Sequence, residues 1–170
     1  MAFKLFGKKN KYSEANVSVP DPKPVMGITK MMLPLIARDF PGFSWDEWKI
    51  CCEDMLLEYL SGFSNEQMNE FAYVSENLKR EIQRILEQNI NEGVIVRYEN
   101  LRLYQTEIIK YEKEGDVCVI QMKTSVTFIY SANYPREVFD IPTERLYVME
   151  LRYREVPEVH GEVSKIVLDR

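Results

Sequence analysis

The sequence is poor in the residues and runs on which several classes of protein depend. It has no long uncharged apolar run, so we expect no helix that spans a bilayer. It contains one histidine, His160, and no CxxC pair, which argues against a zinc site. It also lacks a Gly-rich phosphate loop, a GxSxG turn and any regular spacing of metal ligands. With a net charge of −5 it matches nucleic acid poorly, since phosphate binding favours a basic surface.

Cysteine is also scarce, with three residues in the chain. Cys51 and Cys52 are adjacent and Cys118 stands alone, so the count is odd and has no framework spacing. This argues against a secreted disulfide scaffold and favours a reducing compartment. No histidine is near them in the sequence, so we expect inert core thiols rather than a nucleophile. The chain is therefore expected to be cytoplasmic and to hold no metal or cofactor.

The first 24 residues have the composition of a flexible basic tail followed by a Pro-rich linker. The linker "NVSVPDPKP" has three prolines in nine residues, and the tail has four lysines with no acid before Glu14. Lysines beside apolar anchors suit reversible binding to an anionic membrane surface, at the inner face of the membrane. The alternative is a disordered, solubilising terminus. The candidate membrane contacts are Phe3, Lys4, Phe6, Lys8, Lys9 and Lys11.

The stretch "GFSWDEW", residues 42–48, combines tryptophans, carboxylates and a serine, but its spacing is that of a helix start. Ser44 and Glu47 form a capping box, and Phe43 and Trp48 occupy the two positions of a hydrophobic staple. "GFSNEQM", residues 62–68, repeats the same pattern of capping and apolar residues, with Ser64 as the N-cap. Two helix starts are easier to accept than two active sites of one form, so we interpret both stretches as structural.

Further along the chain the hydrophobic period changes from helical to alternating. A helix is predicted before Asp39, with apolar residues at helical spacing expected in the core. Pro34 should kink this run or mark the first turn of a second piece. Another is predicted to end at Gly93. Strict alternation then predicts strands, with 131–144 as a loop between the last two. The predicted strands are 99–112, 117–130 and 145–155, and the apolar helical positions are Ile28, Met31, Met32, Leu35 and Ile36.

Helices followed by an antiparallel meander indicate an α+β fold. We expect N-terminal helices packed on one face of a curved antiparallel sheet, in a cone-like domain over residues 25–156, with 157–170 as a C-terminal extension. Glu150 lies mid-strand beside apolar neighbours, and a solvated sheet face is the favoured interpretation over a pocket. The expected cavity or interface lining is aromatic: Trp48, Tyr59, Tyr130, Tyr147 and Tyr153.

The pattern resembles a known family over roughly residues 26–154. "DFPGFSWDEW" looks like the family's entry to its first long helix, and an acidic helix pair ends in "NEG". "VRYENLRLYQTEIIKYEKEGDVCVIQMKTSVTF" looks like its strand, short turn and long strand. The family is the inner-membrane translocase subunit forty-four-like domain, whose fold is similar to the nuclear transport factor 2-like cone. The resemblance implies a non-enzymatic domain at a membrane surface that holds a protein partner and touches anionic lipid.

Two other interpretations remain open. The first is a small-ligand binder or small enzyme of the isomerase or dehydratase type that uses the interior of the cone. The second is a homodimer through the open face of the sheet, lined by Tyr130, Tyr147 and Tyr153. The leading expectation is a non-catalytic scaffold or adaptor with no catalytic residue, associated with the membrane from the cytoplasmic side.

Overall fold

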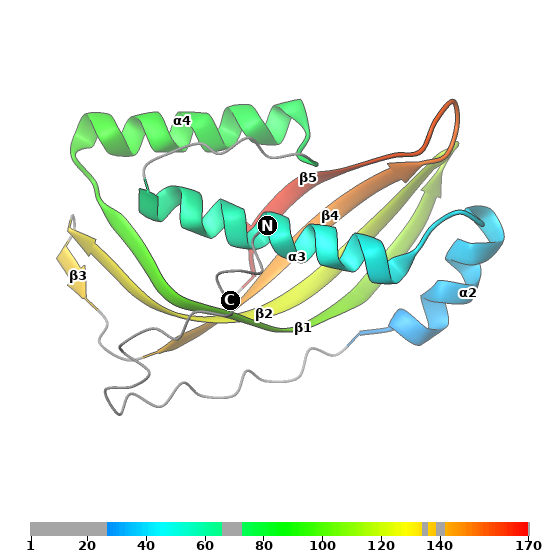
Figure 1. Cartoon of the computed structure of the whole chain (residues 1–170), viewed down its shortest axis with the longest axis horizontal. Coiled ribbons are helices and arrows are strands. Elements are labelled where there is room, and N and C mark those ends of the chain that lie inside the picture. The colour runs from blue at the N-terminus through cyan, green and yellow to red at the C-terminus, as the bar shows by residue number, and fades with distance from the viewer. Residues whose placement is uncertain (1–26, 66–72, 134–135, 139–141, 170) are drawn as a thin grey trace.

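The computed structural model describes residues 27–65, 73–133, 136–138 and 142–169. In this part of the chain, three helices pack against one antiparallel sheet (Figure 1). The α+β prediction is therefore confirmed. The tail and linker, with all six candidate membrane contacts, lie outside the described residues. The elements are α2 (Thr29–Asp39), α3 (Trp45–Asn65), α4 (Glu76–Glu92), β1 (Val96–Glu114), β2 (Val117–Asn133), β3 (Arg136–Val138), β4 (Thr143–Arg154) and β5 (His160–Leu168).

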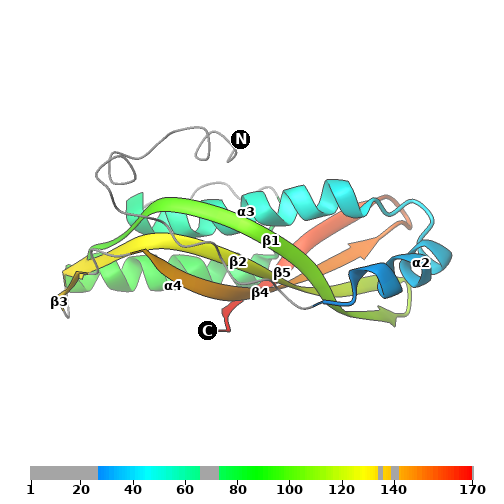
Figure 2. The ribbon, with the colours of Figure 1, turned by 90° about the horizontal axis from the view of Figure 1, so that it is seen from below.

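The sheet has the strand order β1-β2-β4-β5, and short β3 pairs with the end of β2. All of these pairings are antiparallel. The long strands curve, and α3 and α4 lie over the concave side, while α2 sits at one end (Figures 1 and 2). In the part of the chain that the structure describes, no helix is long and apolar enough to cross a membrane.

Helix starts and stops follow the sequence signals in two of three places. The backbone N–H of Glu47 donates to Ser44 Oγ (3.4 Å) at the start of α3. α4 ends at Gly93, which has a left-handed φ of 67°. The start at Ser64 was a wrong prediction, because α3 runs through that residue to Asn65. The rest of the expected second helix lies outside the described residues.

Helix α2 is fastened to the edge of the sheet at both of its ends. The N–H of Ile28 donates to the carbonyl of Ile108 (2.9 Å), and the N–H of Ile108 donates to Thr29 Oγ1 (2.8 Å). At the other end, the hydroxyl of Tyr111 donates to Asp39 Oδ2 (2.8 Å). Pro34 lies inside this single helix, so it does not divide the run into two pieces.

Edge strand β1 is irregular. Its pairing with β2 shifts register between Glu99 and Arg102, between Leu103 and Thr106, and between Ile108 and Lys110. Asn100, in the first of these bulges, has a φ of +56°. Bulges twist an edge strand and interrupt the row of free backbone groups that another strand would need.

Strand β5 was not predicted from the sequence, because residues 157–170 were expected to form a C-terminal extension. Residues His160–Leu168 pair with β4 throughout, so this segment belongs to the sheet. The 131–144 loop likewise contains β3. The inner edge of β5 meets β4, and at Val163 its outer edge forms a parallel bridge with Val74.

The alternation expected along β2 and β4 is confirmed by which side chains join the hydrophobic core. Odd-numbered residues of β4 from Tyr147 to Tyr153 join the core under the helices, as do Ile120 and Met122 of β2. The core is completed by α3 residues such as Cys52 and Leu56. The helices therefore cover one face of the sheet, as predicted.

Candidate functional site

The "GFSWDEW" stretch forms an aromatic cluster around Tyr153 of β4. The ring of Phe43 packs edge-on against Tyr153 at 5.0 Å between centroids, and Trp48 does so at 5.7 Å. Tyr73 meets the other side of Trp48 at 5.6 Å. Edge-to-face contacts of this kind stabilise by roughly 0.5–1.5 kcal/mol each beyond area burial. The residues of the stretch thus fix the start of α3 on the sheet, in agreement with the structural interpretation.

The five expected lining aromatics do not form one site. Trp48 and Tyr153 lie at one end of α3, whereas Tyr59 lies farther along the helix and packs on Phe63 at 4.8 Å. Tyr130 lies beside Tyr98, with their rings 5.3 Å apart. Burial, Tyr98, Tyr59 and Tyr130 together raise the pKa of Tyr147, so these tyrosines form a second group.

Two of the three tyrosines named for an open sheet face, Tyr147 and Tyr153, lie in the core instead. Tyr147 is 5% exposed and Tyr153 1% exposed, and both belong to the core under the helices. Tyr130 also packs against this core. Burial raises the pKa of Tyr147 and of Tyr59 above the ordinary value of tyrosine.

Glu150, the candidate pocket acid, lies on the face of the sheet opposite the helices, because its neighbours Met149 and Leu151 point into the core. It is only 8% exposed. Ser164 Oγ donates to its Oε1 (2.9 Å), and the cations of Arg152 and Lys165 lie 3.9 Å away. This carboxylate therefore belongs to a network of ion pairs on the outer face and does not point into the concave side.

A carboxylate that does reach the inner face was missed by the sequence analysis. Thr106 Oγ1 donates to Glu53 Oε2 (2.5 Å), and it lies 3.1 Å from Thr124 Oγ1. Both threonines are buried. Thr124 is the one polar residue on the apolar side of β2, and that is the signal the sequence offers. Its hydroxyl is satisfied through Thr106, and the pair ties α3 to β1 and β2.

The three cysteines are free thiols, as expected from their spacing. Cys52 and Cys118 are fully buried, and Cys51 is half-buried. Burial raises the pKa of all three thiols, that of Cys118 to about 12. A nucleophilic cysteine needs a lowered pKa, so these have the properties of core residues. No group of metal-ligating side chains occurs among the residues that the structure describes.

The largest departure from the expected core is on α2. Of the five apolar positions expected in the core, Met32 and Ile36 face the protein, but the N-cap residue Ile28 and the helical residues Met31 and Leu35 are exposed, with Met31 at 68%. These three lie at i, i+3 and i+7 and so form one stripe along the helix. We call them the α2 stripe.

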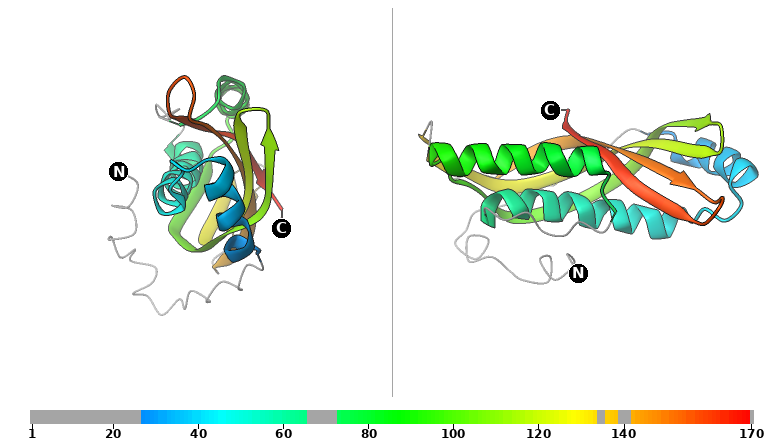
Figure 3. Two further views of the ribbon diagram at one scale, coloured as in Figure 1. Left: turned by 90° about the vertical axis from the view of Figure 1, so that its right-hand side faces the viewer. Right: turned by 90° about the horizontal axis from the view of Figure 1, so that it is seen from above.

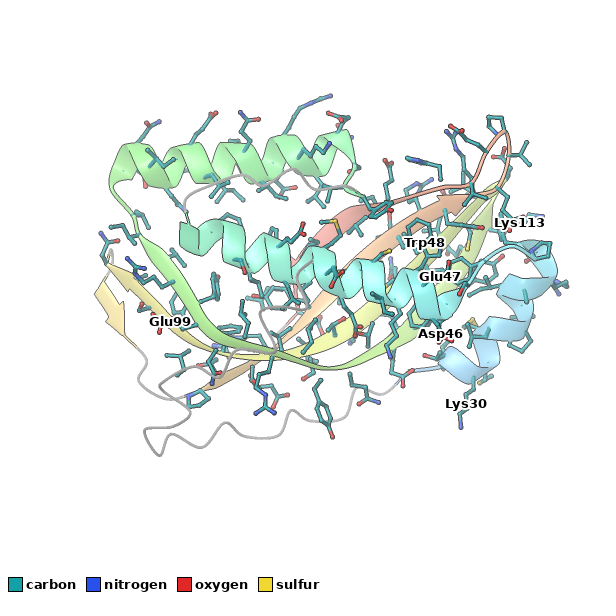
Figure 4. The ribbon with its side chains drawn as sticks, viewed as in Figure 1. Lys30, Asp46, Glu47, Trp48, Glu99 and Lys113 are labelled. Carbon is teal, nitrogen blue, oxygen red and sulfur yellow. The ribbon has the colours of Figure 1, made fainter. Side chains whose placement is uncertain are left out.

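The charges around the α2 stripe are mostly basic. Lys30 projects from α2 away from the body of the protein (Figure 4), and Arg38 is 68% exposed. The one acid of α2, Asp39, is engaged by Arg38 (3.1 Å) and by Tyr111. α2 thus presents an apolar stripe beside two cations, and the basic tail joins the described chain at its N-terminal end.

Comparison with known proteins shows no family for this chain. No protein-family model matches it, and no curated protein matches it in sequence. Among solved structures, the intermembrane space region of the chloroplast protein ARC6 aligns with a TM-score of 0.44 and 8% sequence identity. That alignment covers 69% of this chain and 92% of the other. A similarity at this level supports no inference about function.

Proposed function

We propose that this protein is a non-catalytic scaffold or adaptor that binds the cytoplasmic side of an anionic membrane through its tail and α2, and holds a protein partner there. The observation that carries the proposal is the α2 stripe, Ile28, Met31 and Leu35, exposed beside Lys30 and Arg38. An exposed apolar stripe on a helix with basic flanks is the arrangement by which amphipathic helices lie in a membrane interface.

The tail and α2 reinforce each other because they are consecutive in the chain. Each lysine near an anionic leaflet contributes about 1 kcal/mol, so the four tail lysines together favour binding by roughly 4 kcal/mol before entropy costs. The three exposed apolar side chains of the α2 stripe add hydrophobic contact with the membrane, which salt does not screen. One signal of each kind gives reversible binding rather than permanent anchoring.

The resemblance to the translocase-subunit-like family supports the scaffold part of the proposal, since such domains hold partners without catalysis. The contacts of the candidate catalytic groups also support a non-catalytic role. Glu150 is engaged in ion pairs on the outer face, Glu53 holds Thr106, and His160 lies at the exposed start of β5, 3.6 Å from Glu162.

Co-sedimentation with anionic and neutral vesicles tests the membrane part. The full chain is compared with two full-length variants: Met31→Glu in the α2 stripe, and one in which Lys4, Lys8, Lys9 and Lys11 are all glutamine. We expect binding to anionic vesicles only, weakened by salt and reduced at least tenfold by the lysine replacements. Met31→Glu should reduce it severalfold, and Ile90→Glu, an exposed position on α4, should not change it.

Absence of binding by the unaltered chain would refute the membrane part of the proposal. Equal binding to neutral vesicles would remove its electrostatic basis. Binding that loses nothing in Met31→Glu would confine the contact to the tail and exclude α2.

A further inference from the structure

Among the residues that the structure describes, the outer edge of β5 has no backbone partner beyond its bridge to Val74. The N–H of Asp169 donates to the carbonyl of Leu146 (2.7 Å), which fixes the direction of the backbone groups at this end of β5. In an antiparallel ladder, alternate residues direct N–H and C=O to the same neighbour. The backbone groups of Val167 therefore point to β4, and those of Ile166 and Leu168 point outward.

The bridge supplies an independent check on this direction. The N–H of Val163 donates to Tyr73, and the carbonyl of Val163 accepts from Ser75, so the backbone of Val163 points outward. The register then shifts by one residue at Ser164, opposite the step between Glu150 and Leu151. Because of this extra residue, the backbone groups of Val167 point to β4, as the hydrogen bond from Asp169 to Leu146 requires. No backbone partner of the outward groups at Ile166 or Leu168 occurs among the described residues.

The two edges of the sheet differ sharply in their protection. β1 carries three register shifts, and Ile28 and Thr29 occupy the backbone groups of Ile108. The open part of β5 has no shift after Ser164, and Val167 and Leu168 are each 54% exposed. Figures 2 and 3 place the end of β5 at the margin of the molecule, on the side away from α3.

We propose that this edge pairs with the same edge of a second copy of the chain, antiparallel and about a two-fold axis through Val167. In that register, the outward groups of Ile166 face those of the partner's Leu168, and the reverse, giving about four ladder hydrogen bonds. Ile166 and Leu168 flank the axis equally, so the outward N–H and C=O groups of one copy meet those of the other.

The side chains complement each other in the same register. Lys165, Val167 and Asp169 alternate along the outer face, since Lys165 pairs with Glu150 and Val167 with Val148. The two-fold axis sets Lys165 opposite the partner's Asp169 and brings the two Val167 side chains together. Opposite charges and β-branched residues are the cross-strand pairs that stabilise sheets. Within one chain Lys165 lies 3.9 Å from Glu150 and Asp169 lies 3.2 Å from Lys123, so the cross-axis pair extends an existing row of alternating charges.

A contact this short buries little area, so the dimer should be weak and dependent on concentration. Sedimentation velocity of the full chain, with reductant present, should show a monomer shifting to a dimer across about a hundredfold rise in concentration. Amide hydrogen exchange supplies the register. The amides of Ile166 and Leu168 should slow severalfold on dimerisation, whereas that of Val167, which already faces β4, should not change.

Two variants test the edge without touching the bonds to β4. Val167→Lys sets two like charges against each other across the axis and should abolish the dimer. Leu168→Pro removes an N–H that points outward, so the β4 ladder keeps its bonds while the dimer loses two of its own. Val159→Lys, an exposed valine in the preceding loop, is the matched control and should dimerise normally.

Folding of each variant is checked by its unfolding midpoint. A monomer at every concentration overturns the proposal, as does a dimer that survives both edge variants. Protection that spreads to other surfaces, with Ile166 and Leu168 unchanged, would assign the dimer to a different face and also overturn it. These outcomes are independent of vesicle binding.

Discussion

The indole of Trp48 fills the space beside Gly161, so closely that a Cβ added to Gly161 would overlap the ring. The two residues lie in α3 and β5, and they are more than a hundred positions apart in sequence. The contact closes one end of the core, where Tyr153 and Tyr73 hold the other sides of the ring. A single hydrogen atom in place of a side chain thus decides how α3 lies on the sheet.

Replacing Gly161 by alanine is expected to destabilise the protein by about 1–3 kcal/mol, because the added methyl group forces the indole to move in a packed core. Urea unfolding measures this loss. Trp48→Leu should make the same change at Gly161 less costly, so the two substitutions should be strongly non-additive in a double-mutant cycle. Val159→Ala, in the exposed loop before β5, serves as the control. An unchanged midpoint for Gly161→Ala would show that the ring is not fixed there.

The two serine caps are expected to differ in strength. Ser75 Oγ accepts from the N–H of Leu78 at 3.2 Å and is buried, whereas the Ser44 cap is exposed and 3.4 Å long. Ser75→Ala should cost about 1–2 kcal/mol and Ser44→Ala no more than about 1 kcal/mol. Ser75→Asp, which keeps an acceptor, should recover part of the loss in chemical denaturation. The reverse order of the two alanine variants would contradict the assignment.

Asp39 should make stability depend on acid pH. The hydrogen bonds from Arg38 and Tyr111 lower the pKa of this carboxyl below its ordinary value of 3.8. A lowered folded-state pKa adds stability above the unfolded pKa, and that stability is lost as the pH falls through the folded value. Asp39→Asn should therefore destabilise the protein at pH 7, and the difference from the unaltered chain should shrink as the pH falls below the ordinary value of 3.8.

Unfolding midpoints between neutral pH and acid measure the effect. Tyr111→Phe removes only one of the two donors, so it should give a smaller loss with the same direction of pH dependence. A difference that stays constant into acid would mean that Asp39 acts through packing alone.

Thiol chemistry should separate the three cysteines. Because burial raises the pKa of Cys118 to about 12, roughly one thiol in ten thousand is ionised at pH 8. Cys52 is also fully buried, so half-buried Cys51 should account for nearly all the slow reaction of the folded protein with an aromatic disulfide reagent. Cys51→Ala should remove that reaction, while urea should expose two thiols. Fast reaction of the Cys51→Ala variant in its folded state would contradict this order.

The sequence was sufficient to predict features that depend on local spacing. Alternation along β2 and β4, the start of α3 at Ser44 and the stop at Gly93 each follow from a few neighbouring residues, and the structure has them all. Ser64 shows the limit of such signals. Its neighbours repeat the pattern around Ser44, but helix α3 continues through it, so a cap residue does not start a helix where one is already running.

Features set by distant neighbours were not predictable. The apolar residues of β5 do not alternate regularly, and the strand is stabilised by its long ladder with β4, which no local pattern reveals. The α2 stripe has the spacing of a core face, and only the position of α2 at the end of the sheet leaves it exposed. The placement of Tyr147 and Tyr153 under the helices follows from which sheet face α3 and α4 cover, a choice that alternation alone leaves undecided.

The bulges of β1 limit how far this protein can assemble. A fibre grows by adding strands at both edges of every subunit, and here one edge is irregular and fastened by α2. In the dimer proposed above β5 is occupied, and the bulged edge of β1 is a poor template for a further strand. The shape of this one strand therefore favours a pair over a filament.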